Sequence, residues 1–542
     1  EYLVWAIAVL LRVIVGLWGY SGAGVAPMYG DFEAQRHWLE ITIALPIGDW
    51  YRHTASNDLQ YWGLDYPPLT AYVSYVFGMI AKKVVPALVT LFESRGHESE
   101  NGKLFMRASV IALDIVLLIP IMTLVCKEVL AELRRSGKSV SISDRYVSHF
   151  ACLTIPGLLL IDHGHFQYNG VCLALALLGA YLVSKDNDIL GSIFFCLSLN
   201  FKQMSLYYAP VFFCFLLRKC ITQPTILSKM LSFAKLGITV ISTFGLLWAP
   251  FCVFHSPEDT CLTSLGQVLH RQFPFSRGIF EDKVANLWYT LSVAVDFREH
   301  LTAQQLLASS LTLTLFLLLP TCAYLLTRRA TFTALLFALM NSSLAFFLAS
   351  FQVHEKSVLL MLAPAAPLLL LDQKYFCFVQ LLGCFTMFPL LVKDKLRVPY
   401  LACCGLYLAL TCLLDGPATD STEASDGAKK QTMEKLYAKL AYTTGDIARQ
   451  MGWLGELLAI EPVKSVLIGL SAFGMIVLHL LEIFVPAPQR LPDLYAALFS
   501  IFGAANLCVI YLVGVCWLWW LPSADAQSRK LKSENVAVTQ KD

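Results

Sequence analysis

The chain has 542 residues, of which 57% are hydrophobic and only 15% are charged, and its formal net charge is +2. Soluble domains usually carry about a quarter charged residues, so the composition excludes an ordinary soluble enzyme. The small net charge argues against a polyanionic partner, and no nucleic-acid-binding signature is present. Apolar stretches of about 16–25 residues recur along the sequence and are long enough to cross a bilayer. The sequence therefore predicts an all-α polytopic membrane protein.

Fifteen apolar stretches are candidate membrane spans. The stretch 286–299 is short and ends in charged residues, so we assign it to a loop. Without it about 14 spans remain, and both termini fall on the same side of the membrane. The fifteen stretches are residues 2–20, 105–126, 146–161, 170–185, 189–201, 204–219, 232–252, 286–299, 305–327, 331–351, 356–371, 374–392, 398–414, 462–485 and 494–520.

The distribution of Lys and Arg predicts how these spans are oriented. Basic residues gather in the short loops 127–145, 218–235 and 328–329 and in the tail 529–532, all on one side. That side should be cytosolic, because short loops rich in Lys and Arg stay in the cytosol. One loop, with Lys393, Lys395 and Arg397, falls on the opposite side as an exception.

Residues 66–92 are apolar enough to resemble a span, but they open with Tyr66-Pro67-Pro68 and contain Lys82 and Lys83. A span here would move the basic loop 127–145 out of the cytosol. We therefore expect an interfacial or re-entrant helix inside a long first lumenal loop. The predicted organisation is a catalytic transmembrane core (1–414, with its first loop at about 21–104), a polar and partly disordered cytosolic insertion (415–460), C-terminal spans (461–521) and a cytosolic tail (522–542).

Most of the 16 cysteines lie in apolar stretches, where they are typical of small buried hydrophobic residues. Cys252 and Cys261 flank one polar segment and are able to pair in an oxidising compartment, although sequence alone does not decide it. The tripeptide Asn341-Ser342-Ser343 is a glycosylation sequon inside a candidate span, and its use is likewise left open.

Six polar motifs from distant parts of the chain fall on the non-cytosolic side of this topology. Titratable side chains gathered at one membrane surface are typical of the cavity of a polytopic enzyme. The motifs predict an active site on that side. They are residues 31–38 with Asp31, Glu33, Arg36 and His37, residues 65–68 with Asp65, residues 162–165 with Asp162, His163 and His165, residues 201–203 with Lys202, residues 277–282 with Arg277, Glu281 and Asp282, and residues 354–356 with His354, Glu355 and Lys356.

The first loop is acidic and rich in aromatic residues, a composition that suits sugar binding. For Trp50 and Tyr51 an interfacial aromatic belt is the simpler explanation. Asp31 follows Gly30 near the exit of the first span. We expect partial desolvation to raise the pKa of this carboxyl, which would let it take a proton from a hydroxyl nucleophile.

The remaining motifs supply bases and cations. His163 and His165 are spaced i, i+2, which is a weak metal signal without a completing carboxylate pattern, and we expect no metal. Lys202, Arg277, His354 and Lys356 together would suit a clamp for a lipid phosphate. The alternative for each is a snorkelling or solvated helix end.

Several strings resemble the glucosyltransferases that use dolichyl-phosphate-glucose to extend the lipid-linked N-glycan precursor. The resemblance covers residues 10–520 and is strongest in YGDFEAQRHW (29–38), LQYWGLDYPPLT (59–70), LIDHGHFQYN (160–169), FKQM (201–204), FPFSRGIFEDKVAN (273–286) and FQVHEK (351–356). It implies a C-type glycosyltransferase fold and a lumenal active site in the endoplasmic reticulum membrane. Asp31 would be the catalytic base, and the other motif residues would bind substrate.

The resemblance also implies the substrates. Dolichyl-phosphate-glucose would be the donor, a dolichyl-pyrophosphate-linked high-mannose oligosaccharide the acceptor, and no cofactor would be needed. The form EAQRHW (33–38) resembles the members that add the first glucose, whereas the sister enzyme that adds the second resembles EVHRNW. A transporter of lipid-linked sugars is the alternative from another class. It would show midplane charges and internal repeats, which we do not find.

Overall fold

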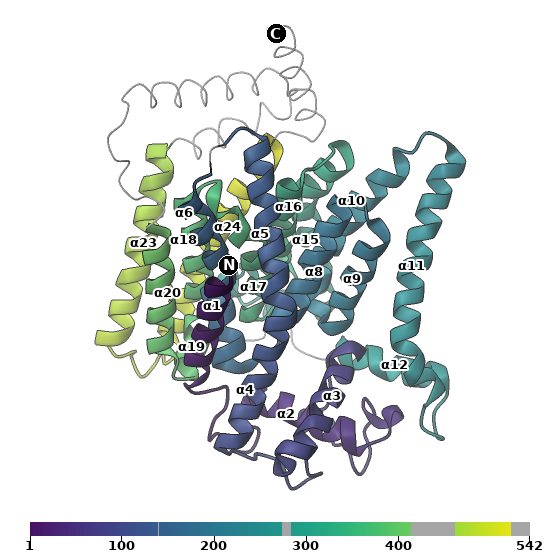
Figure 1. The fold of residues 1–542 in the computed structure, drawn as a ribbon. Coiled ribbons are helices and arrows are strands. Elements are labelled where there is room, and N and C mark those ends of the chain that lie inside the picture. Colours follow the sequence, from purple (N-terminus) through teal and green to yellow (C-terminus); the bar gives the residue numbers. More distant parts are fainter. Residues whose placement is uncertain (139, 274–282, 413–460, 522–542) are drawn as a thin grey trace.

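The computed structural model describes residues 1–138, 140–273, 283–412 and 461–521, and Figure 1 shows the fold. Within these ranges the chain is helical and forms no β-strand beyond a single bridge between Thr54 and Asn57. The predicted cytosolic insertion and tail lie outside the described residues, as do Arg277, Glu281 and Asp282.

Long apolar helices run side by side and form a bundle (Figure 1). Eight helical segments of the described chain are long and apolar enough to cross a membrane, and four shorter apolar helices accompany them. The chain is a multi-pass membrane protein, and the count of about 14 spans stays a prediction. The bundle contains α1 (Tyr2–Gly16), α4 (Glu100–Leu113), α5 (Ile119–Arg135), α6 (Ile142–Leu153), α8 (Asn169–Ser184), α9 (Asp188–Phe201), α10 (Ala209–Ile221), α11 (Ile226–Val253), α15 (Ala303–Thr327), α16 (Phe332–Ala349), α17 (Leu359–Ala365), α18 (Gln373–Thr386), α19 (Phe388–Lys393), α20 (Arg397–Cys412), α23 (Glu461–Phe484) and α24 (Leu494–Trp520).

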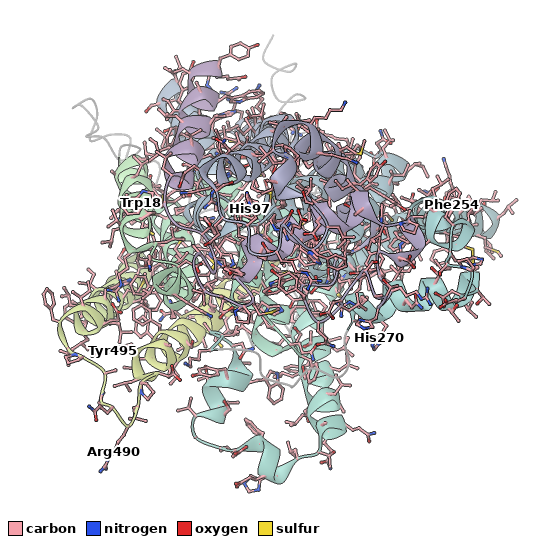
Figure 2. The ribbon with its side chains drawn as sticks, turned by 90° about the horizontal axis from the view of Figure 1, so that it is seen from below. Trp18, His97, Phe254, His270, Arg490 and Tyr495 are labelled. Atoms are coloured by element: carbon pink, nitrogen blue, oxygen red, sulfur yellow. A yellow bond between two sulfur atoms is a disulfide. The ribbon has the colours of Figure 1, made fainter. Side chains whose placement is uncertain are left out.

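Three helices lie beyond one end of the bundle, at the bottom of Figure 1: α2 (Gly30–Ala44), α3 (Pro68–Val84) and α12 (Cys261–Gln272). We call this end the loop face, and Figure 2 views it end-on with His97 near its centre. Helix α3 packs closely on α2, since a Cβ atom at Gly78 would lie 2.7 Å from the carbonyl oxygen of Leu39. Within the predicted stretch 66–92, residues 68–84 form α3 outside the bundle, and its interfacial or re-entrant position in the membrane stays a prediction.

The doubtful stretch 286–299 forms only α13 (Leu287–Ser292) and α14 (Phe297–His300), which are too short to cross a bilayer. Its assignment to a loop is therefore correct.

Burial separates central from peripheral helices. Nearly every side chain of α16 is buried, whereas α11 and α23 leave most of their apolar side chains exposed. Exposed Leu and Ile on a bundle helix are favourable only against lipid, because water would oppose them. Asn341 lies inside α16 and is fully buried, so its sequon is inaccessible in the folded protein.

A disulfide joins Cys252, near the end of α11, to Cys261 at the start of α12. The pairing that the sequence left open is therefore present in the fold. Most of the other described cysteines are buried, as expected for small hydrophobic residues.

Candidate functional site

Asp31 opens α2 at a sharp turn on the loop face. Tyr29 and Gly30 have φ angles of 59° and 70°, and a Cβ atom at Gly30 would lie 2.7 Å from the hydroxyl oxygen of Ser21. Glycine is required here, because an L side chain would meet both strain and a collision. The Ser21 hydroxyl accepts a hydrogen bond from the Asp31 backbone N–H, at 3.2 Å. The turn therefore fixes Asp31 in the first turn of α2, where the helix dipole favours a carboxylate.

Three donors from other elements converge on one oxygen of Asp31. Its Oδ2 atom accepts hydrogen bonds from Lys356 Nζ at 2.5 Å, Gln167 Nε2 at 2.5 Å and His165 Nε2 at 3.0 Å. The side chain remains 26% exposed. Within the described residues, every side-chain donor to this carboxylate ends on Oδ2, so Oδ1 is available to another group.

The charge state of Asp31 differs from the sequence-based expectation. Burial raises the pKa of this carboxyl, but Lys356 and His165 oppose burial and hold the pKa well below its usual value. The expected raised pKa is therefore wrong, because two positive groups outweigh desolvation. Asp31 is ionised at neutral pH and is a weak base in this state.

Lys356 comes from a short 3₁₀ turn, Glu355–Val358, that precedes α17. Burial alone lowers the pKa of its ammonium, but the charge of Asp31 and its hydrogen bond raise the pKa above the usual value. Lys356 is therefore a fixed cation beside the Asp31 carboxylate.

His165 lies in a π-helical turn, Leu159–Phe166, that follows α6 and α7 (Pro156–Leu158). Such wide turns are frequent at functional sites, since they re-aim successive side chains. Its Nε2 atom faces Asp31, and its Nδ1 atom lies 2.5 Å from Asp394 Oδ2. A carboxylate faces each ring nitrogen, an arrangement that favours the doubly protonated imidazolium.

Lys202 is connected to Asp31 through Gln167. The Lys202 ammonium donates to Gln167 Oε1 at 2.8 Å and to Asn169 Oδ1 at 2.5 Å, and it lies 4.9 Å from the centre of the Tyr66 ring. The amide group of Gln167 donates in turn to Asp31. Lys202 is 3% exposed, and its hydrogen bond to Oε1 holds the Gln167 amide in place. Its direct contact with a phosphate stays a prediction.

Asp162 belongs to the same network. Its carboxylate accepts hydrogen bonds from Asn169 Nδ2 and from the Gly170 backbone N–H, both at 2.7 Å. It therefore orients the Asn169 side chain that accepts from Lys202.

His163 points away from His165. Its Nε2 atom lies 2.9 Å from Asp114 Oδ2, and the same oxygen accepts from Arg12 Nε at 2.6 Å. Arg12 and Asp114 are both buried inside the bundle. The two histidines have separate carboxylate partners, so their i, i+2 spacing reflects two hydrogen-bond networks.

Glu33, Arg36 and His37 lie on the buried side of α2, away from the Asp31 carboxylate. Arg36 makes two hydrogen bonds to Glu33, at 2.6 and 2.7 Å, and a third to the Leu88 carbonyl oxygen at 2.8 Å. Glu40 pairs with Arg36 at 2.7 Å and with His37 at 3.3 Å. These contacts favour a role in holding the first loop together, and direct contact with substrate stays a prediction.

The remaining predicted site residues belong to three motifs of the chain. The Asp65 carbonyl oxygen lies 3.4 Å from Gln203 Nε2, which lies equally close to the carbonyl oxygen of Gln272 in α12. His354 and Glu355 directly precede Lys356 in the sequence, and Lys356 is the residue that contacts Asp31. Arg277, Glu281 and Asp282 are outside the described residues, so their roles stay predictions.

Comparison with known proteins identifies the family. Residues 8–514 match the model described as "ALG6, ALG8 glycosyltransferase family". The chain belongs to that glycosyltransferase family.

Similar proteins of the family match over almost their whole length. A Gallus gallus protein named dolichyl pyrophosphate Man9GlcNAc2 alpha-1,3-glucosyltransferase is 40% identical over 95% of this chain and 95% of its own. The Mus musculus protein of the same name is 39% identical over 97% of this chain and 98% of its own. A Dictyostelium discoideum protein bearing that name as a probable activity is 40% identical over 94% of this chain and 93% of its own. This ALG6, ALG8 family chain is a glycosyltransferase, as the sequence motifs predict.

Three sets of residues that are linked by hydrogen bonds to the predicted site residues were not predicted from the sequence. Gln167 and Asn169 were overlooked because amides carry no charge, although they lie within the motif that contains His165. Asp394 sits in the one basic loop that breaks the charge rule. Arg12 and Asp114 could have been paired from sequence, because opposite charges inside two apolar spans usually meet.

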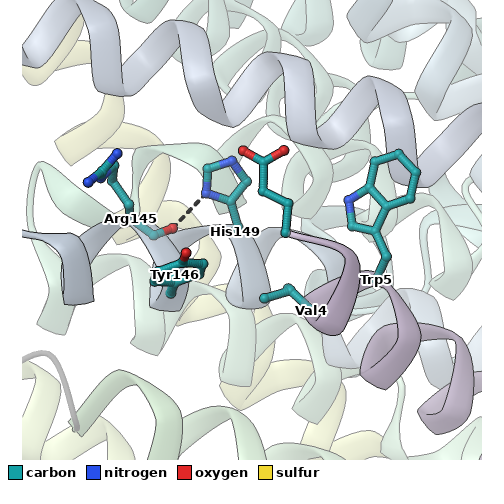
Figure 3. A pocket seen from close by; sticks show the side chains of 6 residues that line it. Val4, Trp5, Arg145, Tyr146 and His149 are labelled. Atoms are coloured by element: carbon teal, nitrogen blue, oxygen red, sulfur yellow. Dashed lines mark hydrogen bonds between the residues drawn. The ribbon is translucent and has the colours of Figure 1, made fainter.

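A separate pocket lies between α1 and α6, at the end of these helices that is remote from Asp31 (Figure 3). Figure 3 shows the hydrogen bond between His149 Nδ1 and the Arg145 carbonyl oxygen within it. The pocket shares no residue with the Asp31 network of this glycosyltransferase. Its lining residues are Glu1, Val4, Trp5, Arg145, Tyr146 and His149.

Proposed function

We propose that the protein transfers the first glucose from dolichyl-phosphate-glucose to dolichyl-pyrophosphate-linked Man9GlcNAc2, in α-1,3 linkage and with inversion. The observation that carries the proposal is the Asp31 carboxyl group, whose Oδ2 atom is held by Lys356, His165 and Gln167 while these donors leave Oδ1 open. The names of relatives about 40% identical over almost the whole chain support the choice of acceptor.

The chemistry follows from this arrangement. A hydroxyl of a terminal mannose attacks the anomeric carbon of the β-linked glucose from the face opposite the phosphate. Asp31 takes the hydroxyl proton at Oδ1, and the bond between the anomeric carbon and the phosphate oxygen breaks. The electron pair stays on that oxygen, so dolichyl phosphate leaves with one more negative charge. Attack from the opposite face converts the β-linkage to α.

Lys356 serves both reacting groups. A cation fixed near the leaving oxygen stabilises the charge that develops on the phosphate. Drawing Lys356 toward the donor phosphate also weakens its hold on Asp31, so the pKa of that carboxyl rises toward the range of an effective base. Donor binding would therefore activate the base.

Further cations complete the phosphate site in this proposal. Lys202, His354 and Arg277 are the candidates, with Lys202 acting at least through Gln167. A phosphate leaving group neutralised by fixed cations needs no divalent metal, and we propose a metal-independent reaction.

We propose further that the loop face lies in the lumen of the endoplasmic reticulum. The Cys252–Cys261 disulfide on this face supports an oxidising compartment. The short basic loops predicted to be cytosolic lie at the opposite ends of the same spans, which supports the same orientation.

The test is glucose transfer by the purified protein from dolichyl-phosphate-glucose to two synthetic acceptors, one ending in mannose and one already carrying the first glucose. We expect covalent transfer to the mannose-ended acceptor alone. Transfer only to the glucosylated acceptor would assign the sister reaction. Movement of the donor across proteoliposomes without a covalent product would assign a transporter.

A further inference from the structure

Asp394 lies behind the histidine that contacts Asp31. It occupies the turn between α19 and α20, and its side chain is 3% exposed. Asp394 Oδ2 lies 2.5 Å from His165 Nδ1, while His165 Nε2 lies 3.0 Å from Asp31 Oδ2. One imidazole therefore joins two carboxylates that are more than 360 residues apart in the chain.

The backbone around His165 is fixed independently of this contact. Arg107 Nη2 donates to the carbonyl oxygens of Gly164, at 2.7 Å, and Gly19, at 3.0 Å. The Ser21 N–H donates to the His165 carbonyl oxygen at 2.9 Å, and the Ser21 hydroxyl accepts from the Asp31 N–H. Ser21 thus connects the backbone of His165 to the backbone of Asp31. The ring of His165 still requires a partner at Nδ1, and Asp394 supplies it.

Asp394 also compensates part of the positive charge beside Asp31. Lys356 Nζ lies 3.2 Å from His165 Nε2, so two cations meet at the Asp31 carboxylate. One carboxylate cannot neutralise both in a partly buried site, and an uncompensated buried charge is costly. Asp394 adds a second carboxylate to this group of cations, and the buried Arg107 guanidinium also interacts electrostatically with it.

We propose that Asp394 is a positioning residue for the transfer reaction, which keeps His165 protonated and oriented so that Oδ1 of Asp31 stays open to the acceptor hydroxyl. This inference rests on the proposed function. It also explains the basic loop on the unexpected side, because that loop delivers Asp394 to the loop face.

The proposal predicts a pH effect with a definite sign. The charged and titratable groups facing Asp31 are His165 from the π-helical turn, Lys356 before α17, Asp394 on the far side of His165, Lys202 beyond Gln167, and Tyr66 of the first loop. Asp394 itself also faces Lys356 and Arg107 of α4. Removing the Asp394 charge makes protonated His165 less stable and takes a positive charge away from Asp31. The pKa of Asp31 then rises, and the acidic limb of the kcat profile moves to higher pH.

The experiment compares the purified parent with Asp394→Asn over a range of pH. We expect kcat to fall about ten- to a hundredfold, as for a reacting group misplaced by about 1 Å. The acidic limb should move up by about one pH unit or more, as expected when a nearby opposite charge is lost. KM for both substrates should stay within about twofold, because Asp394 touches neither. The matched control is Glu482→Gln, which removes the carboxylate paired with Arg397 next to the same turn, and it should keep the parental profile.

The outcomes separate cleanly. A parent that transfers no glucose to either acceptor would overturn the proposed function itself. With an active parent, an unchanged kcat or an unmoved acidic limb in Asp394→Asn would overturn the positioning role. Asp394→Glu provides a second measurement, should the Asn variant not purify as folded protein. It retains the charge at a shifted position, so we expect a lower kcat with the limb at the parental pH, and a parental kcat or a moved limb would contradict the inference.

Discussion

Replacing Asp31 by Asn tests the central assignment most directly. Asparagine keeps the size of the side chain and one oxygen that can accept from Lys356, Gln167 or His165. It removes the proton acceptor. Because the Asp31 side chain is 26% exposed and its backbone is held by Ser21, the substitution should leave the fold intact.

The size of the effect follows from the role of the group. Loss of a general base costs about 100- to 10,000-fold in rate, which is about 3–5 kcal/mol of transition-state stabilisation. The affinity for the donor should not fall with the rate. The uncharged amide would no longer neutralise Lys356, so dolichyl-phosphate-glucose should bind as tightly as in the parent or more tightly.

The assay measures initial rates with radiolabelled dolichyl-phosphate-glucose and a mannose-ended acceptor, together with donor affinity in the same detergent. The matched control is Asp58→Asn, which alters an exposed acid of the same loop that lies near His53, and it should retain the parental rate. Activity of Asp31→Asn within a few-fold of the parent would refute the assignment and make Asp65 the next candidate. A fall in donor affinity equal to the fall in rate would instead assign Asp31 to binding.

Lys202→Met leaves the side-chain oxygen of Asn169 without its donor, at a cost of about 1–3 kcal/mol, and leaves that of Gln167 with Asn169 Nδ2 as its remaining donor. We expect at least about a tenfold lower kcat/KM for the donor in monodisperse protein, and a parental value would limit Lys202 to helix packing. Lys356→Met removes the main cation beside Asp31, on which the lowered pKa of that carboxyl depends. The acidic limb of the activity profile should therefore move to higher pH. An unmoved limb would show that Lys356 does not set this pKa. Arg36→Met leaves the buried carboxylates of Glu33 and Glu40 without their arginine partner and should lower the free energy of unfolding by about 3–5 kcal/mol. We expect a lower Tm in detergent, and an unchanged Tm would contradict a role in holding the first loop together. Chelation with EDTA should leave the parental rate unchanged, and a loss restored by one divalent cation would replace the proposed mechanism.

The class of protein and the face that carries the site follow from sequence because they depend on local signals. Apolar length predicts the spans, and Pro67-Pro68 with Lys82 and Lys83 keeps α3 out of the bundle. The acids and bases around Asp31 are recognisable because each sits where an apolar stretch ends. Their assembly on one face requires only that the spans alternate direction.

The contacts within the site depend on distances that no local pattern contains. His163 and His165 look equivalent in sequence, yet the π-helical turn sends them to Asp114 and Asp394 respectively. The lowered pKa of Asp31 likewise depends on Lys356, which is 325 residues away in the chain. Glu33, Arg36 and Glu40 are different, because their i, i+3 and i, i+4 spacing would have predicted internal ion pairs before any contact with substrate.

The burial of Asn341 bears on how the protein is made. Its Asn-Ser-Ser tripeptide is the one Asn-X-Ser/Thr sequence of the chain in which X is not proline, and it is enclosed in α16 against Gly514 of α24. A glycan is bulky and hydrophilic, and no space exists for it between two packed membrane helices. Modification would have to precede the docking of α24 and would then block that docking. On the proposed function, this tripeptide would in this way stay free of the glycan that the enzyme helps to assemble.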